Sequence, residues 1–179
     1  DLKWNSILKR FSKEMPKNIT HNGLVVPKKE NSLEFNLFLK SFNFFITSSG
    51  LQKKIKYFIG PPQLRIKKGS KKNLFRPNSS EYLHSDAWTK INTKSCITLF
   101  LPINGDCKRN FVEFFIPNNK FSEKWLNQKY FFEGEQLVKK NYKKISIDYS
   151  LNNYILADCA ILHKSTIKKN SDARVSLDI

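Results

Sequence analysis

The spacing of apolar residues predicts two helices within the first fifty positions. Apolar side chains recur at helical spacing over Trp4–Met15, and Pro16 ends that segment. A second helix is predicted over Ser32–Ser48, with Ser32 as its N-cap and Gly50 as its C-terminal stop. Its apolar stripe consists of Leu33, Leu37, Ser41, Phe44 and Phe45. We interpret both stripes as core-facing helix surfaces rather than as parts of a cofactor site.

Beyond Gly50 the pattern changes to the alternation that is typical of β-strands. Lys54–Ile59 alternates with period two, Gly60-Pro61-Pro62 breaks the chain, and Leu64–Ile66 forms another short strand. Further strands are predicted near Glu81–Trp88, Ser95–Ile103, Phe111–Ile116, Lys144–Tyr149, Tyr154–His163 and Ala173–Ile179. Two N-terminal helices followed by many short strands predict a mainly β fold, in which the helices pack on a sandwich or barrel.

Two shorter features punctuate the series of strands. Asn104-Gly105-Asp106 predicts a turn, and Ser122–Tyr130 predicts a helical interlude. The 179 residues suit a single domain. We therefore expect residues 1–50 to form a helical N-terminal support and residues 51–179 to form the β core.

Hydropathy and cysteine content indicate the cellular compartment in which the protein is expected. No apolar run approaches the ~20 residues that span a bilayer, and the N-terminus lacks the apolar region of a secretory signal. Cys96, Cys107 and Cys159 are odd in number, widely spaced and without a CxxC motif, which fits a reducing compartment better than a disulfide framework. We expect a cytoplasmic protein whose cysteines are small buried hydrophobes or neutral surface residues, not ligands.

The net charge narrows the choice of partner. Lys and Arg number 32 against 15 Asp and Glu, giving a formal charge of +17, and such a balance favours nucleic acid, anionic lipid or an acidic small molecule. However, 27 of the basic residues are Lys and only 5 are Arg, a bias typical of an AT-rich genome. Phosphate recognition usually relies on Arg as well, so nucleic acid is disfavoured. The expected partner is a small molecule, for which an anionic character is one possibility, and no membrane partner is expected.

Two of the three histidines stand where they could share a metal ion. His84 and Asp86 are two residues apart on a predicted strand, so their side chains should project to one face. His163 ends a second apolar strand, whereas His21 falls in a predicted surface loop. Two His and one carboxylate form the facial triad of non-haem Fe(II) oxygenases. The structural alternatives are a strand histidine bonded to Asp86 and a satisfied core histidine at position 163.

Arg174 and Ser176 lie beyond the second histidine and share one face of the last predicted strand. A guanidinium beside a hydroxyl suits the far carboxylate of a dicarboxylate, and it would face the metal if the strands of His163 and Arg174 are neighbours. Alternatively, Arg174 pairs with a nearby carboxylate, either Asp172 or Asp178, and Ser176 is only a small inward residue. Trp88 continues the face of His84 and Asp86, either as a substrate-contacting pocket wall or as core.

The combined pattern of His84-x-Asp86, His163 and Arg174-x-Ser176 resembles the Fe(II)/2-oxoglutarate-dependent dioxygenases. The segment from His163 to Arg174 looks like the phytanoyl-CoA hydroxylase-like branch. His84-Ser-Asp-Ala-Trp88 looks like the proximal motif of small bacterial oxygenases related to a streptomycin-biosynthesis protein. The resemblance covers roughly Glu81–Ile179. It implies a double-stranded β-helix of jelly-roll or cupin-like type, catalytic iron held by His84, Asp86 and His163, and Arg174, supported by Ser176, binding the C5 carboxylate of 2-oxoglutarate.

The same resemblance implies hydroxylation of a small polar or acidic metabolite, such as a sugar, an amino acid or a carrier-bound group, with 2-oxoglutarate and O2 as cosubstrates. Strands Ile97–Leu101 and Phe111–Ile116 could supply an apolar wall. A second contact to 2-oxoglutarate is expected from an earlier strand, where the candidates are Gln63, Arg65, Tyr82 and Thr98. Two alternatives are a cupin-type metalloenzyme with other chemistry and a basic non-enzymatic module that binds polyanions.

Overall fold

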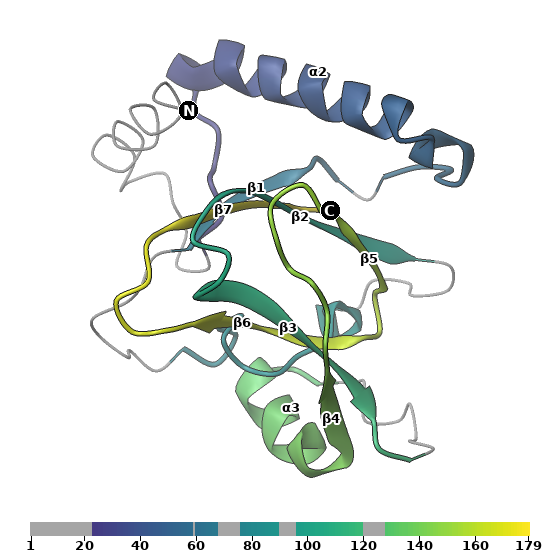
Figure 1. The fold of residues 1–179 in the computed structure, drawn as a ribbon, viewed down its shortest axis with the longest axis vertical. Helices are drawn as coiled ribbons and strands as arrows, with labels where there is room; N and C mark the ends of the chain where they lie inside the picture. Colours follow the sequence, from purple (N-terminus) through teal and green to yellow (C-terminus); the bar gives the residue numbers. More distant parts are fainter. Residues whose placement is uncertain (1–22, 59, 68–75, 90–95, 120–127) are drawn as a thin grey trace.

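The computed structural model describes residues 23–58, 60–67, 76–89, 96–119 and 128–179. Over these residues the chain is mainly β, with seven strands in two antiparallel sheets and two α-helices (Figure 1). The predicted helix Trp4–Met15 and His21 lie outside the described residues, so one of the two expected N-terminal helices is described here.

The larger sheet has the strand order β1–β7–β2–β5 and the smaller sheet the order β4–β3–β6. The strands are β1 (Gln63–Lys67), β2 (Ile97–Gly105), β3 (Asn110–Pro117), β4 (Tyr142–Ile145), β5 (Ile155–Asp158), β6 (Leu162–Ile167) and β7 (Arg174–Asp178). Phe100 on β2 meets Phe114 on β3 edge to face, with ring centroids 5.2 Å apart, so a shared core joins the two sheets.

The antiparallel pairs are nested along the chain. β3 pairs with β4, β2 with β5, and β1 with β7. Between these, an isolated bridge joins His84 to His163 at the edge of β6. Each segment that precedes the β3–β4 connection is therefore paired with one that follows it, and successive pairs alternate between the two sheets.

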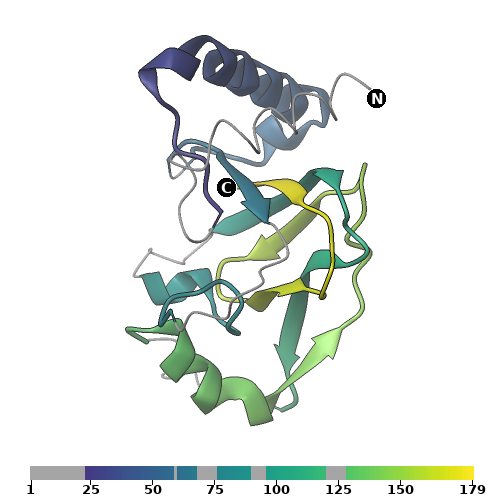
Figure 2. The same cartoon turned by 90° about the vertical axis from the view of Figure 1, so that its left-hand side faces the viewer.

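Helix α2 (Ser32–Ser48) lies across the outer face of the larger sheet, as Figures 1 and 2 show. Its bounds match the prediction, and Gly50, at φ 72°, ends it as expected. The predicted stripe is wrong, because Leu33, Leu37 and Phe44 are 68%, 56% and 72% exposed. The residues that face the sheet are Phe38, Phe42, Phe45 and Ile46. Apolar residues occur on several sides of this helix, so spacing alone did not identify the buried side.

The start of α2 also differs from the prediction. The N-cap is Asn31 rather than Ser32, and neither Asn31 nor Lys28 before it makes a side-chain cap bond. A short 3-10 helix over Lys29–Asn31 leads directly into α2 and supplies the first turn.

Two predicted strands are wrong. Residues 54–58 follow a 3-10 helix over Leu51–Lys53 and run as irregular chain, while Ile59 lies outside the described residues. In the predicted strand Glu81–Trp88 only His84 makes a β-bridge, and a 3-10 helix begins at Asp86. Alternation was misleading in the first case because this segment joins neither sheet, although Ile55 packs on the core beneath α2 while Tyr57 is 73% exposed.

Other boundaries shift without changing the fold class. The predicted strand Tyr154–His163 divides into β5 and β6, which belong to different sheets. β4 ends at Ile145 rather than Tyr149, and the turn after β2 spans residues 106–109. Residues 128–130 of the predicted helical interlude are not helical, and helix α3 (Phe131–Val138) follows them.

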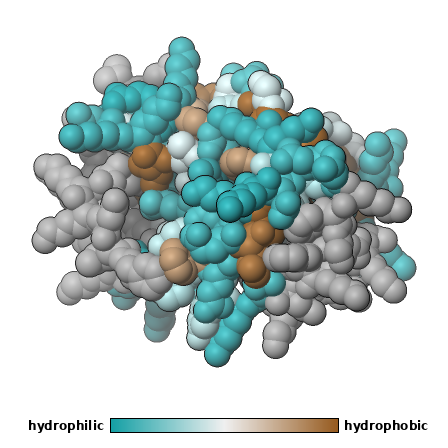
Figure 3. All heavy atoms as spheres, turned by 90° about the horizontal axis from the view of Figure 1, so that it is seen from below, coloured by the Kyte–Doolittle hydropathy of each residue, from teal (hydrophilic) through white to brown (hydrophobic). Residues whose placement is uncertain are grey.

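Helix α3 covers the outer face of the smaller sheet, at the opposite end of the molecule from α2 (Figure 1). Val138 and Phe131 of this helix pack with Trp88 and with Leu162 of β6. Seen from this end, the described residues present a mainly hydrophilic surface with small hydrophobic patches (Figure 3). No helix in the described part of the chain combines the length and apolar character needed to cross a membrane.

Candidate metal centre

Three side chains converge at one point in the interior. His84, Asp86 and His163 each offer a ligand atom, and these atoms all lie within 4.8 Å of one another. The two histidines are held side by side because their backbones exchange both hydrogen bonds, at 3.0 and 2.8 Å. Their ring centroids are 4.4 Å apart. Residues 79 positions apart in the sequence are thereby fixed as neighbours.

Asp86 reaches the two histidines by a route that the sequence analysis did not predict. It begins a 3-10 helix rather than continuing a strand, so the one-face argument for His84 and Asp86 does not apply. The Cys159 carbonyl accepts hydrogen bonds from the Ser85 hydroxyl at 3.0 Å and from the Ala87 N–H at 3.1 Å. These two bonds hold both neighbours of Asp86 and direct its carboxylate toward His163, with 3.8 Å between Asp86 Oδ1 and His163 Nε2.

Hydrogen bonds fix which ring nitrogen of each histidine can bind a metal. His84 Nδ1 lies 2.7 Å from the Tyr82 carbonyl, and His163 Nδ1 lies 3.2 Å from the Ile161 carbonyl. A carbonyl only accepts, so each Nδ1 carries the hydrogen and each Nε2 keeps its lone pair. A backbone carbonyl behind the ring is the usual support of a metal-binding histidine.

The electrostatics favour the ligand form of His84. Burial, and next the neighbouring His163, hold the pKa of His84 well below its ordinary value. A neutral imidazole is the form that binds metal. The Thr98 hydroxyl donates to Asp86 Oδ2 at 3.1 Å, which leaves Oδ1 directed at the histidines. This buried group could therefore hold a metal ion, and its donor set is compatible with Fe(II).

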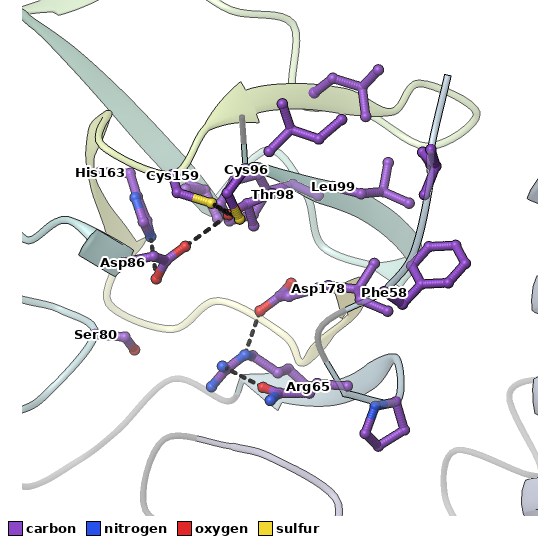
Figure 4. Close-up of a pocket in the computed structure, with 18 of the residues that line it drawn as sticks. Phe58, Arg65, Ser80, Asp86, Cys96, Thr98, Leu99, Cys159, His163 and Asp178 are labelled. Carbon is purple, nitrogen blue, oxygen red and sulfur yellow. Dashed lines mark hydrogen bonds and ion pairs between the residues drawn. The ribbon is translucent and has the colours of Figure 1, made fainter. Parts of the chain in front are cut away.

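The three residues line a cavity of about 610 Å³ that lies between the two sheets (Figure 4). Of the four residues considered for a second cosubstrate contact, Gln63, Arg65 and Thr98 line it. Tyr82 does not, and its ring packs edge to face on Phe132. The predicted apolar wall contributes Ile97, Leu99, Phe100 and Val112.

Arg174 also lines this cavity, although its strand is not a neighbour of the His163 strand as the sequence analysis supposed. β6 and β7 belong to opposite sheets, and both residues point into the space between them. Arg174 is 1% exposed, and neither its Nε nor its Nη1 has a hydrogen-bond partner among the described residues. The expected alternative was an ion pair with Asp172 or Asp178, and neither pair is formed among the described residues. The Asp178 carboxylate pairs with Arg65 instead.

The guanidinium of Arg174 packs over an aromatic ring. Its carbon is 5.2 Å from the centre of the Tyr149 ring, and burial raises the pKa of that phenol, so it stays neutral. A buried cation without a counter-ion is strongly destabilising. The site therefore offers a binding place for an anion with two acceptor atoms.

The two remaining candidate site residues, Ser176 and Trp88, lie outside the cavity. Ser176 is fully buried, does not line the cavity, and its hydroxyl lies 3.5 Å from Asp178 Oδ1. Trp88 is 4% exposed in the core under α3 and also does not line the cavity. Of the two alternatives for Trp88, the structure favours a core residue over a pocket wall. The 3-10 helix that begins at Asp86 turns the Trp88 side chain away from the face of His84.

Two residues of the cavity wall were not expected to face it. Cys96 and Cys159 were interpreted as inert, yet both line the cavity beside Thr98 (Figure 4). Burial, and next the contact with Cys96, raise the pKa of Cys159 to about 12, so this sulfur is a thiol at neutral pH. Their wide separation in the sequence gives no sign of this pairing, which depends on the register of β2 and β5.

Comparisons of the chain with protein-family models, curated proteins and solved structures gave no match.

Proposed function

We propose that this chain is a non-haem Fe(II)- and 2-oxoglutarate-dependent oxygenase that hydroxylates a small polar or acidic metabolite. One observation carries the proposal. A metal-competent group of two histidines and one aspartate shares a cavity with a buried arginine that has no counter-ion among the described residues. Metal ligands alone fit many reactions, whereas the added guanidinium favours a cosubstrate with a free carboxylate.

The arrangement of strands supports the same proposal. Nested antiparallel pairs that alternate between two facing sheets are what a double-stranded β-helix, or jelly roll, requires. In such a fold the inner side chains of both sheets border one central space, which here contains the candidate centre.

Each residue around the cavity has a defined task in this proposal. His84, Asp86 and His163 occupy one side of the metal and leave its other positions for cosubstrate and oxygen. When bound, the iron together with 2-oxoglutarate and O2 supplies an oxidant able to attack an unactivated C–H bond. The carbonyls of Tyr82 and Ile161 orient the imidazoles, and Thr98 orients the carboxylate. Leu99, Phe100 and Val112 keep water from the reacting carbon.

The first prediction concerns the metal. Wild type should bind one Mn(II), a stand-in for Fe(II), per chain, and His84→Ala and Asp86→Asn should each weaken binding at least ~10-fold because each removes a ligand. Isothermal titration calorimetry of the metal-free protein measures this directly. Asp172→Asn, which changes an exposed carboxylate, is the matched control and should bind as wild type does. Unchanged affinity in folded His84→Ala protein would reject the assigned centre.

The second prediction concerns the carboxylate. With Mn(II) present, 2-oxoglutarate should raise the melting temperature of wild type further, and Arg174→Lys should lose most of this added shift because a single ammonium cannot form a bidentate pair. Arg109→Lys, on the exposed surface, should keep it. If Arg174→Lys gains as much as wild type, the carboxylate role is wrong.

The melting-temperature test with Mn(II) and 2-oxoglutarate also distinguishes the oxygenase from the two alternative functions. A cupin-type metalloenzyme has no use for a carboxylate clamp at Arg174, so it predicts a shift with Mn(II) and none with 2-oxoglutarate. A basic polyanion-binding module predicts steeply salt-dependent binding that is indifferent to His84. Succinate formation that requires both Fe(II) and 2-oxoglutarate, and is lost in His84→Ala, is the outcome that the oxygenase predicts.

A further inference from the structure

Two thiols face each other in the cavity wall. Cys96 Sγ and Cys159 Sγ lie 2.6 Å apart, with Cys159 buried and Cys96 partly exposed (Figure 4). The third cysteine, Cys107, lies in the core between the sheets and is not part of this pair.

The backbone places these two residues where a disulfide can form. In the β2–β5 ladder Ile97 stands opposite Asp158, so the next position in register sets Cys96 opposite Cys159. The Cys159 N–H donates to the Cys96 carbonyl at 3.3 Å, which extends the ladder to this pair. Directly opposed residues on antiparallel strands have Cα atoms about 4.5–5.5 Å apart, within the ~4.4–6.8 Å that disulfides span. The bond therefore needs only side-chain adjustment.

We propose that Cys96 and Cys159 are a redox-modification site that closes to an intramolecular disulfide when a peroxide enters the cavity. Cys96 is the more accessible sulfur and reacts first. Its sulfur takes one oxygen from hydrogen peroxide, the O–O bond breaks, and one water leaves as a sulfenic acid forms. The Cys159 sulfur then attacks the sulfenic sulfur, the S–O bond breaks, and a second water leaves. Two thiols are oxidised by two electrons and one peroxide is reduced to two waters.

The pair is connected to the candidate metal centre by two contacts. The Thr98 hydroxyl lies 3.6 Å from Cys159 Sγ and donates to Asp86 at 3.1 Å. The Cys159 carbonyl holds the residues on both sides of Asp86. Disulfide closure draws the two sulfurs from 2.6 Å to about 2.05 Å, and metal–ligand distances tolerate changes of only about 0.2 Å. Oxidation should therefore weaken metal binding, a second part of the inference that rests on the proposed centre.

Peroxide treatment of the metal-free full-length chain tests the first part without any iron chemistry. We expect intact-mass analysis to show a loss of 2 Da and thiol titration after denaturation to fall from three thiols to one. Digestion should yield a Cys96–Cys159 peptide that dithiothreitol reverses. Cys107→Ser should still lose two thiols, whereas Cys159→Ser should not form the bond.

Three results would reject the proposed disulfide. The first is that three thiols remain after excess peroxide, and the second is a mass gain of 32 or 48 Da that is the same in wild type and Cys159→Ser. The third is the formation of cross-linked dimers. For the second part, Mn(II) titration should show at least ~3-fold weaker binding in oxidised than in reduced wild type. Peroxide should leave the affinity of Cys159→Ser unchanged. Equal affinities of the two wild-type forms would reject the coupling while leaving the disulfide and the metal centre intact.

Discussion

At the scale of single residues, the larger sheet holds two buried cations at paired positions. Lys67 on β1 stands opposite Arg174 on β7, and these side chains are 5% and 1% exposed. Lys67 Nζ donates to the Ser80 hydroxyl at 2.6 Å, which satisfies a hydrogen bond without adding a counter-charge. Two buried cations at paired positions repel each other, and an anion bound at Arg174 in the cavity would offset this repulsion.

This environment predicts a pH dependence of stability. Burial, and next the guanidinium of Arg65, lower the pKa of Lys67 from 10.5 to about 8. Between these pH values the unfolded chain keeps a proton that the folded chain has released, so the free energy of unfolding should rise from about pH 8 to pH 10.5. Relative to Lys67→Met, the wild type should gain at most about 3 kcal/mol over this window.

Urea denaturation of both proteins at pH 8 and at pH 10.5 measures the gain, and the variant cancels the other titrating groups. A difference between the two proteins that stays constant or shrinks as the pH rises contradicts the assignment of a depressed Lys67 pKa.

The residues of the candidate metal centre could be singled out from the sequence because few histidines exist and their spacing to Asp86 and Arg174 is unusual. The geometric reason given for them was only partly right. Asp86 points at His163 because Cys159 holds its neighbours, not because it shares a strand face with His84. Local alternation cannot reveal a hydrogen bond between residues more than seventy positions apart.

At the scale of elements, helix α3 depends on Gly134, although glycine usually destabilises the interior of a helix. A Cβ at Gly134 would lie 2.2 Å from Cζ3 of the Trp88 ring, so the helix can approach this ring closely only because Gly134 has no side chain. Helix α3 was not predicted, and most of the helix predicted over Ser122–Tyr130 lies outside the described residues. Gly134 faces the core but adds no apolar side chain to the helical spacing, so the sequence pattern of α3 is weak.

Gly134→Ala therefore reverses the usual effect of that substitution. In an unencumbered helix it stabilises by up to about 1 kcal/mol, but here the clash with Trp88 should destabilise the protein by about 1–3 kcal/mol. Thermal or urea unfolding gives the sign. Gln136→Ala, at an exposed position of the same helix, should change stability by less than about 0.5 kcal/mol. A stabilised Gly134→Ala protein would mean that α3 does not sit against Trp88.

At the scale of the whole molecule, α2 and the larger sheet meet through one row of apolar side chains. Phe42 and Ile46 are buried against Leu99 and Leu177, whereas Phe44 faces away. The strands β2, β3 and β7 and the extent of α2 were predictable from local pattern. The buried side of α2, and the assignment of β6 and β7 to opposite sheets, were not, because both depend on which distant segments pair.

A matched pair of substitutions tests how α2 is oriented on the sheet. Phe42→Ala should lower the free energy of unfolding by about 3–5 kcal/mol because it opens a cavity in the core. Phe44→Ala, 72% exposed, should change it by less than about 0.5 kcal/mol. Equal losses in the two variants, measured by urea denaturation, would contradict the orientation described here.

The position of β7 bears on how the chain is made in a cell. This strand lies between β1 and β2, which otherwise share no hydrogen bonds, and it carries Arg174. While a ribosome is still producing residues 174–178, β1 and β2 lack the strand that lies between them. Pairing between strands so far apart in the sequence is slow. Until residues 174–178 emerge from the exit tunnel, the nascent polypeptide therefore has neither the complete larger sheet nor the cavity that Arg174 lines.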